Sequence, residues 1–220
     1  MKSILGKSQI LLSVMISEID YESAIEVFLP HILNNTTTLA HARPFIEVLS
    51  ENFALTQSAI TTAMETFPQS VKDELAVRAI NEFQNEIIKL LLSFASQKNL
   101  HFSIDSLVAE NNGTNLTVYA GIQDIDYTSA VEILSPFYKE TYLSKLEKTP
   151  KFLRTTGSLA KTAVKLALIA LPQKKKDALS VEAVNACSRK IASALEEYIQ
   201  SQKIQLSIGN IMACIAGEDS

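Results

Sequence analysis

An internal repeat is the sequence feature that most constrains how this chain can fold. The twelve residues from Ile19 to Pro30 recur from Ile125 to Pro136, 106 residues later, with seven identities and three exchanges between similar apolar residues. A second block, Pro68 to Ala109, aligns without gaps with Pro172 to Ala213, 104 residues later. Chance similarity does not keep order, spacing and polarity over two such blocks. We therefore predict a tandem duplication of a unit of about 105 residues.

Four strands are predicted, because apolar and polar residues alternate with a period of two at the start and end of each copy. The strands are expected at residues 8–17, 100–108, 116–122 and 204–212. The alternation predicts that Val108 and Met212 lie on the strongly apolar face of the sheet. It places Leu107 on the opposite face.

A hairpin is predicted to join the two copies across Asn111-Asn112-Gly113. A two-residue turn would pair apolar residues with polar ones. A three-residue loop that ends in a left-handed glycine pairs Val108 with Leu116 and Phe102 with Ile122, so that the apolar faces agree. We therefore expect the three-residue loop.

The segments between the strands have helical patterns. Asp20 and Asp126 precede such patterns at positions where a carboxylate can accept the free N–H groups of the first turn. After Pro68, apolar residues follow at spacings of four and three up to Phe94, and copy two repeats this pattern after Pro172. Both patterns predict helices of about 30 residues that pack on the sheet.

The predicted fold is therefore α+β: a tandem duplication of a strand–helices–strand unit that forms a pseudo-twofold, four-stranded antiparallel sheet covered on one face by helices. Copy one spans residues 1–110 and copy two spans residues 111–220. Because a central hairpin joins the copies, we expect one compact structural unit. This arrangement is consistent with an ancestral homodimer fused into one chain.

The second face of the sheet contains the candidate site. The expected register places Asp105 opposite Tyr119, with His101 on the same strand as Asp105. This surface can be a solvated face, as in many antiparallel sheets. It can also contact a protein partner or a second copy of the chain, through Leu11, Met15, Leu107 and Ile211. The third possibility is a chemical site in which His101, Asp105 and Tyr119 bind a polar ligand or relay a proton.

Charge is distributed unevenly along the chain. Residues 1–110 contain seven basic and thirteen acidic groups, whereas residues 111–220 contain thirteen and eleven. Ten basic groups but only two acidic ones lie between Lys139 and Lys176. This segment can contact an acidic partner, nucleic acid or an anionic membrane surface, or it can be a solvated face that balances the acidic residues of copy one. The candidate residues of this basic surface are Lys151, Arg154, Lys161, Lys165, Lys174, Lys175 and Lys176.

No cofactor or metal is expected. The two cysteines and three histidines form no metal-ligand cluster, and local motifs of phosphate loops, dinucleotide sites or nucleophile elbows are missing. No apolar run reaches the roughly 18 residues of a membrane span. Cys187 and Cys214 lie in apolar stretches, which favours reduced thiols and a cytoplasmic location.

The sequence does not identify the function, but it leaves three possibilities. The first is a non-catalytic binding or interaction protein that uses the second sheet face or the basic surface. The second is a binder of a small apolar or amphipathic molecule, held between sheet and helices. The third is an enzyme with a site near His101, Asp105 and Tyr119.

Overall fold

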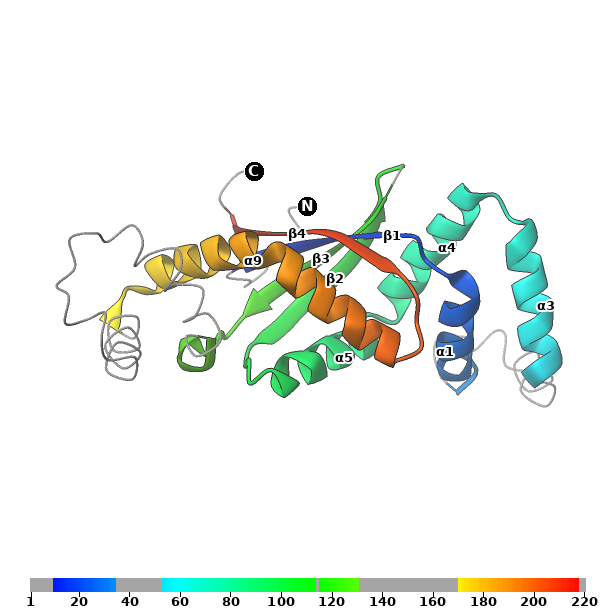
Figure 1. Cartoon of the computed structure of the whole chain (residues 1–220), viewed down its shortest axis with the longest axis horizontal. Helices are drawn as coiled ribbons and strands as arrows, with labels where there is room; N and C mark the ends of the chain where they lie inside the picture. Colours follow the sequence, from blue (N-terminus) through cyan, green and yellow to red (C-terminus); the bar gives the residue numbers. More distant parts are fainter. Residues whose placement is uncertain (1–9, 35–52, 114, 131–169, 218–220) are drawn as a thin grey trace.

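The computed structural model describes residues 10–34, 53–113, 115–130 and 170–217, and these form an α+β fold (Figure 1). The predicted fold class is confirmed at this level. The elements in chain order are β1 (Ile10–Ser17), α1 (Tyr21–Asn34), α3 (Phe53–Thr66), α4 (Gln69–Glu82), α5 (Gln84–Gln97), β2 (Ser103–Asn111), β3 (Leu116–Gln123), α9 (Gln173–Ser201) and β4 (Ser207–Ile215).

The four strands form one antiparallel sheet in the order β2-β3-β1-β4. Strands β1 and β3 occupy the centre, and β2 and β4 form the edges. Strands from the first and second halves of the chain therefore alternate across the sheet. Neither half contains two strands that are hydrogen-bonded neighbours, so each half depends on the other to complete the sheet.

Helices α4, α5 and α9 pack against one face of this sheet, which we call the inner face (Figure 1). Its aliphatic side chains form three neighbouring clusters of buried residues. In one of them, Leu107 and Leu116 contact Ile80 and Ile87 of the helices. In another, Ile208 and Ile211 contact α9. Removal of these side chains from water is the main source of stability for a sheet of this kind.

Two bulges interrupt the edge strands. The pairing of β2 with β3 shifts by one residue between Ile104 and Ser106, so Asp105 is the extra residue. On the other edge, β1 pairs Ile16 with Ile208 and Val14 with Ile211, which again leaves one extra residue in β4. A bulge reverses the alternation of side chains beyond it.

Because of this reversal, some side chains lie on the opposite face of the sheet from the one predicted. Leu107 and Ile211 are buried on the inner face, with 0% and 3% of their surfaces exposed. Val108 and Met212 therefore lie on the opposite face, and their predicted positions in the apolar core are wrong. The alternation of side chains between the two faces holds on each side of the bulge, but it is interrupted at the bulge itself.

The hairpin prediction is wrong for the same reason. Asn111 pairs with Leu116, and the Asn112 N–H donates to the Asn115 carbonyl at 3.1 Å. Val108 therefore pairs with Tyr119 and not with Leu116, so the register that the three-residue loop requires is not formed. Gly113 adopts a φ of 86°, which favours glycine at this turn. The bulge at Asp105 restores the agreement of apolar faces that the observed register would otherwise destroy.

The helices before β2 and β4 differ in continuity. Helix α9 is continuous over 29 residues, as expected. The corresponding segment before β2 is divided at Phe83 into α4 and α5. Asn85 stands next to this junction where α9 has Arg189, and asparagine has lower helix propensity than arginine.

Candidate functional site

The outer face of the sheet lies opposite α4, α5 and α9, the helices that pack on the inner face. Successive strand residues point to opposite faces, so this face is identified from the register. Its apolar side chains and the short polar ones between them are Leu11, Ser13, Met15, Val108, Thr117, Tyr119, Met212 and Cys214.

Four of these residues form a central row across all four strands. Val108 of β2 pairs with Tyr119 of β3, Tyr119 pairs with Ser13 of β1, and Ser13 pairs with Met212 of β4. The Ser13 hydroxyl also reaches the Met212 carbonyl at 3.5 Å. Met212 is 57% exposed, more than any other large apolar residue that the structure describes. On the central strands, Thr117 is buried at 7% exposed and Ser13 and Tyr119 are half-buried, so the most exposed apolar side chain of the row is Met212, on the edge strand β4.

Met15 extends this apolar surface over the bulge in β4. A Cβ atom built on Gly209 would lie 3.6 to 3.7 Å from the Met15 side chain. That is ordinary van der Waals contact, so Met15 packs closely over the glycine. On the other side of the central row, Leu11 pairs with Cys214. Burial raises the pKa of the Cys214 thiol, which disfavours its reactive thiolate form.

Among the strand residues, charged side chains on the outer face come from the edge strand β2. Strands β1, β3 and β4 contribute none to it, whereas β2 contributes Asp105 and Glu110. A solvated sheet face and an exposed edge strand usually contain charged residues, which prevent association. The outer face lacks this protection over three of its four strands.

The predicted juxtaposition of Asp105 with Tyr119 is wrong, because Tyr119 pairs with Val108. Asp105 lies in the bulge, three residues earlier, and its carboxylate accepts a hydrogen bond from the Ser106 hydroxyl at 3.0 Å. His101 is exposed and precedes β2, where its carbonyl accepts the Asp126 N–H at 2.8 Å. The register thus separates the tyrosine ring from the bulge, and His101 lies further along the strand.

The predicted partner contact is corrected in two of its four members. Leu11 and Met15 lie on the outer face as expected. Leu107 and Ile211 are in the core, so Val108 and Met212 take their places. Gly209 was a sequence signal for the bulge in β4, which exchanges Ile211 with Met212, since a glycine within a strand often marks a bulge.

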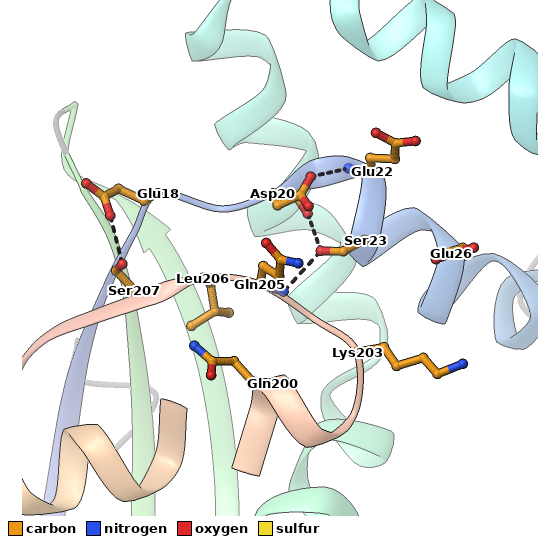
Figure 2. Close-up of a pocket in the computed structure, with 10 residues that line it drawn as sticks. All are labelled: Glu18, Asp20, Glu22, Ser23, Glu26, Gln200, Lys203, Gln205, Leu206 and Ser207. Carbon is orange, nitrogen blue, oxygen red and sulfur yellow. Dashed lines mark hydrogen bonds between the residues drawn. The ribbon is translucent and has the colours of Figure 1, made fainter. Parts of the chain in front are cut away.

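A second surface feature is an open groove of about 870 Å³ at the strand ends (Figure 2). Its lining includes four acidic side chains but one lysine: Glu18, Asp20, Glu22, Glu26 and Lys203. Ser207 donates to Glu18 at 2.8 Å, and Ser23 donates to the Asp20 carbonyl at 2.9 Å (Figure 2). The groove is thus polar, and several of its lining residues are hydrogen-bonded to one another. It differs from an apolar pocket between the sheet and the helices.

Asp20 and Asp126 are N-caps, as predicted. The Asp20 carboxylate accepts the Glu22 N–H at 3.1 Å, and the Asp126 carboxylate accepts the Thr128 N–H at 2.9 Å. Burial raises the pKa of Asp126, but hydrogen bonds from Thr128 and Ser129 together outweigh it, so the pKa lies below its ordinary value. Both carboxylates therefore have a structural role.

The tyrosine after each cap joins a second helix. The Tyr21 hydroxyl donates to Asp73 at 2.6 Å, and the Gln69 amide donates to the same carboxylate at 2.8 Å. Burial, together with the adjacent Asp73 carboxylate, raises the pKa of Tyr21 well above its ordinary value. These bonds attach the start of α1 to the start of α4.

An equivalent cluster lies at the start of α9. The Tyr127 hydroxyl donates to Asp177, and Gln173 donates to both residues, at 3.0 and 2.9 Å. The Asp177 side chain is buried, and the Lys176 ammonium lies 5.7 Å from the centre of the Tyr127 ring. The duplicated Pro-Gln and Lys-Asp pairs of the sequence thus form helix-start clusters.

The predicted basic surface lies mostly outside the described residues: Lys151, Arg154, Lys161 and Lys165 are among residues 131–169. Lys174, Lys175 and Lys176 are in the first turn of α9. Successive helix residues point about 100° apart, so these three do not form one face. Lys174 and Lys175 are exposed, whereas Lys176 is half-buried.

Cys187 and Cys214 are both half-buried and are not joined by a disulfide. Within the described ranges, no group of three or more histidine, cysteine, aspartate or glutamate residues is arranged to hold a metal ion.

Among the helices of the described ranges, none has the length and apolarity required to cross a bilayer.

Comparisons with known proteins returned no match, whether against protein-family models, curated proteins or solved structures.

Proposed function

We propose that this chain is a non-catalytic interaction protein whose binding surface is the outer face of its sheet. The observation that supports this proposal is the central row, where Val108, Tyr119 and Met212 place apolar surface on a face without central charges. Val108 and Tyr119 are half-buried and Met212 is 57% exposed, and apolar side chains that stay accessible on one face are a feature of protein-binding sites. Met212 supports the same proposal, because methionine adapts its shape to a partner surface.

The alternative of a small ligand held between sheet and helices has less support. That space contains the three clusters of buried side chains, in which inner-face residues contact the helices directly. The alternative of an enzyme has less support as well, because Asp105 does not pair with Tyr119 as predicted. The location in the cytoplasm stays a prediction.

The proposal includes a tandem duplication with pseudo-twofold symmetry, residues 1–110 and 111–220 together forming one structural unit. The central pairing supports it: Ser13 and Tyr119 are equivalent positions of the repeat, and they face each other in the middle of the sheet. A twofold axis through this pair would exchange β1 with β3 and β2 with β4. It would also exchange Val108 with Met212, the two ends of the central row.

Matched details of the backbone support the same symmetry. Glu18 and Asp124, equivalent in the repeat, have φ angles of 51° and 52°. Asn81 and Asn185 are also equivalent, and each bonds through its side-chain amide to both backbone groups of one strand residue, Ala109 or Ala213. Both bulges occur at equivalent positions.

Capture of partners from extracts of the source cells tests the proposed function. The full chain and its Met212→Lys variant are immobilised separately, and bound proteins are quantified by mass spectrometry. We expect the variant to lose the specific partner, because a lysine at the central row adds a charge to the contact. Leu75→Lys is the matched control, since Leu75 is also exposed, at 38%, but lies on α4. Identical capture by all three proteins would contradict the proposal.

A further inference from the structure

We infer that the partner of the outer face is a second copy of this chain, stacked sheet against sheet; this inference rests on the proposed function. Sheets pack face to face at about 10 Å, with side chains from the two faces interdigitated. The central row supplies such side chains across all four strands.

The size of the outer face fits a dimer contact. Four strands of about eight residues cover about 500 Å² in projection, and their corrugated side-chain surface is larger. Specific interfaces bury about 600 to 1,000 Å² on each partner. Two outer faces in contact therefore approach the lower end of this range.

The charge distribution favours a copy of the same chain over a charged partner. The chain has a net charge of −4, so two copies repel wherever their acidic surfaces meet. The outer face avoids this repulsion, because β1, β3 and β4 contribute no charged side chain to it. Asp105 and Glu110 lie on the edge strand, where they can remain at the rim of the contact.

The layout of the central row also suits self-association. Val108 and Met212 occupy the two ends of the row, and Tyr119 lies next to its centre. A twofold contact requires that one surface be complementary to itself. With apolar side chains at both ends, two such rows place apolar surface on apolar surface in either direction.

The edges of the sheet offer less room for a second copy. The Asn185 amide donates to the Ala213 carbonyl at 2.9 Å and accepts the Ala213 N–H at 2.7 Å, which occupies both backbone groups. Glu196 accepts the N–H of Ile208 on the same strand. On β2, Asn81 occupies Ala109 in the same way. Strand addition at these edges would have to break these bonds, so a second copy is expected on the outer face rather than at the edges of the sheet.

Sedimentation equilibrium of the full chain, from about 1 to 100 µM, tests the inference. We expect a mass of two chains, and at least a tenfold weaker self-association for Met212→Lys. Val108→Lys, at the other end of the row, should weaken it similarly. Leu75→Lys should leave it unchanged, and circular dichroism checks that each variant is folded.

A monomer across the whole range, or a dimer that both central-row variants leave intact, would overturn the inference. Neither result would by itself remove the proposed function, because the capture experiment asks separately whether another protein binds this face. Identical capture by the full chain and Met212→Lys would overturn the proposed function as well.

Discussion

The two faces of the sheet use the same four strands for different purposes. On the inner face, Leu107, Ala109 and Leu116 are at most 3% exposed and pack against helices. On the outer face, Met212 is 57% exposed, and polar side chains such as Ser13 interrupt the apolar ones. The contrast indicates that the inner face stabilises the fold, and the proposed partner contact uses the outer face.

The largest expected effect comes from dividing the sheet. A fragment of residues 1–110 retains β1 and β2, which are not neighbours, and loses the strands that complete the inner face. We expect this fragment to be insoluble, or to dimerise by pairing β1 with β1 in place of β3. Its mass and its circular dichroism spectrum measure the outcome. A well-folded monomer would contradict the proposed duplication of interdependent copies.

The next effect compares neighbouring residues on opposite faces. Leu107→Ala creates a cavity in the core and should lower the free energy of unfolding by about 3 kcal/mol. Val108→Ala removes surface from the outer face and should lower it by about 1 kcal/mol or less. Urea denaturation of the two variants measures both values. Equal losses would mean that the outer face is as important to the fold as the inner one.

Loss of an edge cap should have an intermediate effect. Asn185→Ala leaves the N–H and carbonyl of Ala213 without their side-chain partner and should cost about 2 kcal/mol. Asn210→Ala, on an exposed position of the same strand, should change the stability by less than about 0.5 kcal/mol. Thermal or urea unfolding distinguishes the two. If the variants unfold alike, the amide of Asn185 does not stabilise the edge.

A smaller effect depends on pH. The pKa of Tyr21 is raised in the folded state, so folding favours the protonated hydroxyl that donates to Asp73. Its contribution is fully present below the ordinary pKa of about 10 and is lost as the pH rises through the higher folded value. Tyr21→Phe should therefore cost about 1 kcal/mol at neutral pH, and less in alkali. A difference from the unmodified chain that does not shrink above pH 10 would refute this assignment.

The smallest effect is expected from the basic surface. Simultaneous Lys174→Glu, Lys175→Glu and Lys176→Glu substitutions should change self-association by less than about twofold, because these side chains are not on the outer face. Acidic residues also suit the first turn of a helix. Sedimentation equilibrium at low and moderate salt measures the result. If the triple substitution abolished self-association, the basic surface and not the outer face would be the binding site.

The features that the sequence predicted correctly share a local cause. The strands follow from alternation, and the caps at Asp20 and Asp126 follow from carboxylates that precede helical patterns. The antiparallel sheet follows from the short connection between the second and third strands. Each of these inferences depends on a few neighbouring residues, so sequence alone was sufficient.

The missed features depend on the pairing of distant strands. A single extra residue at Asp105 exchanged Leu107 with Val108, and the same occurred for Ile211 and Met212. Strict alternation of apolar and polar residues does not predict where such an extra residue lies. The predicted contacts of the candidate site were affected most, because a shift of one residue moves a side chain to the other face of the sheet.

Native mass spectrometry of the protein, purified gently from its own cells, measures directly what the outer face binds. We expect a particle that contains two copies of the chain, or one chain with a bound protein, and we expect Met212→Lys to release a single chain. A single chain that retains a small molecule, unchanged by Met212→Lys, would contradict this expectation.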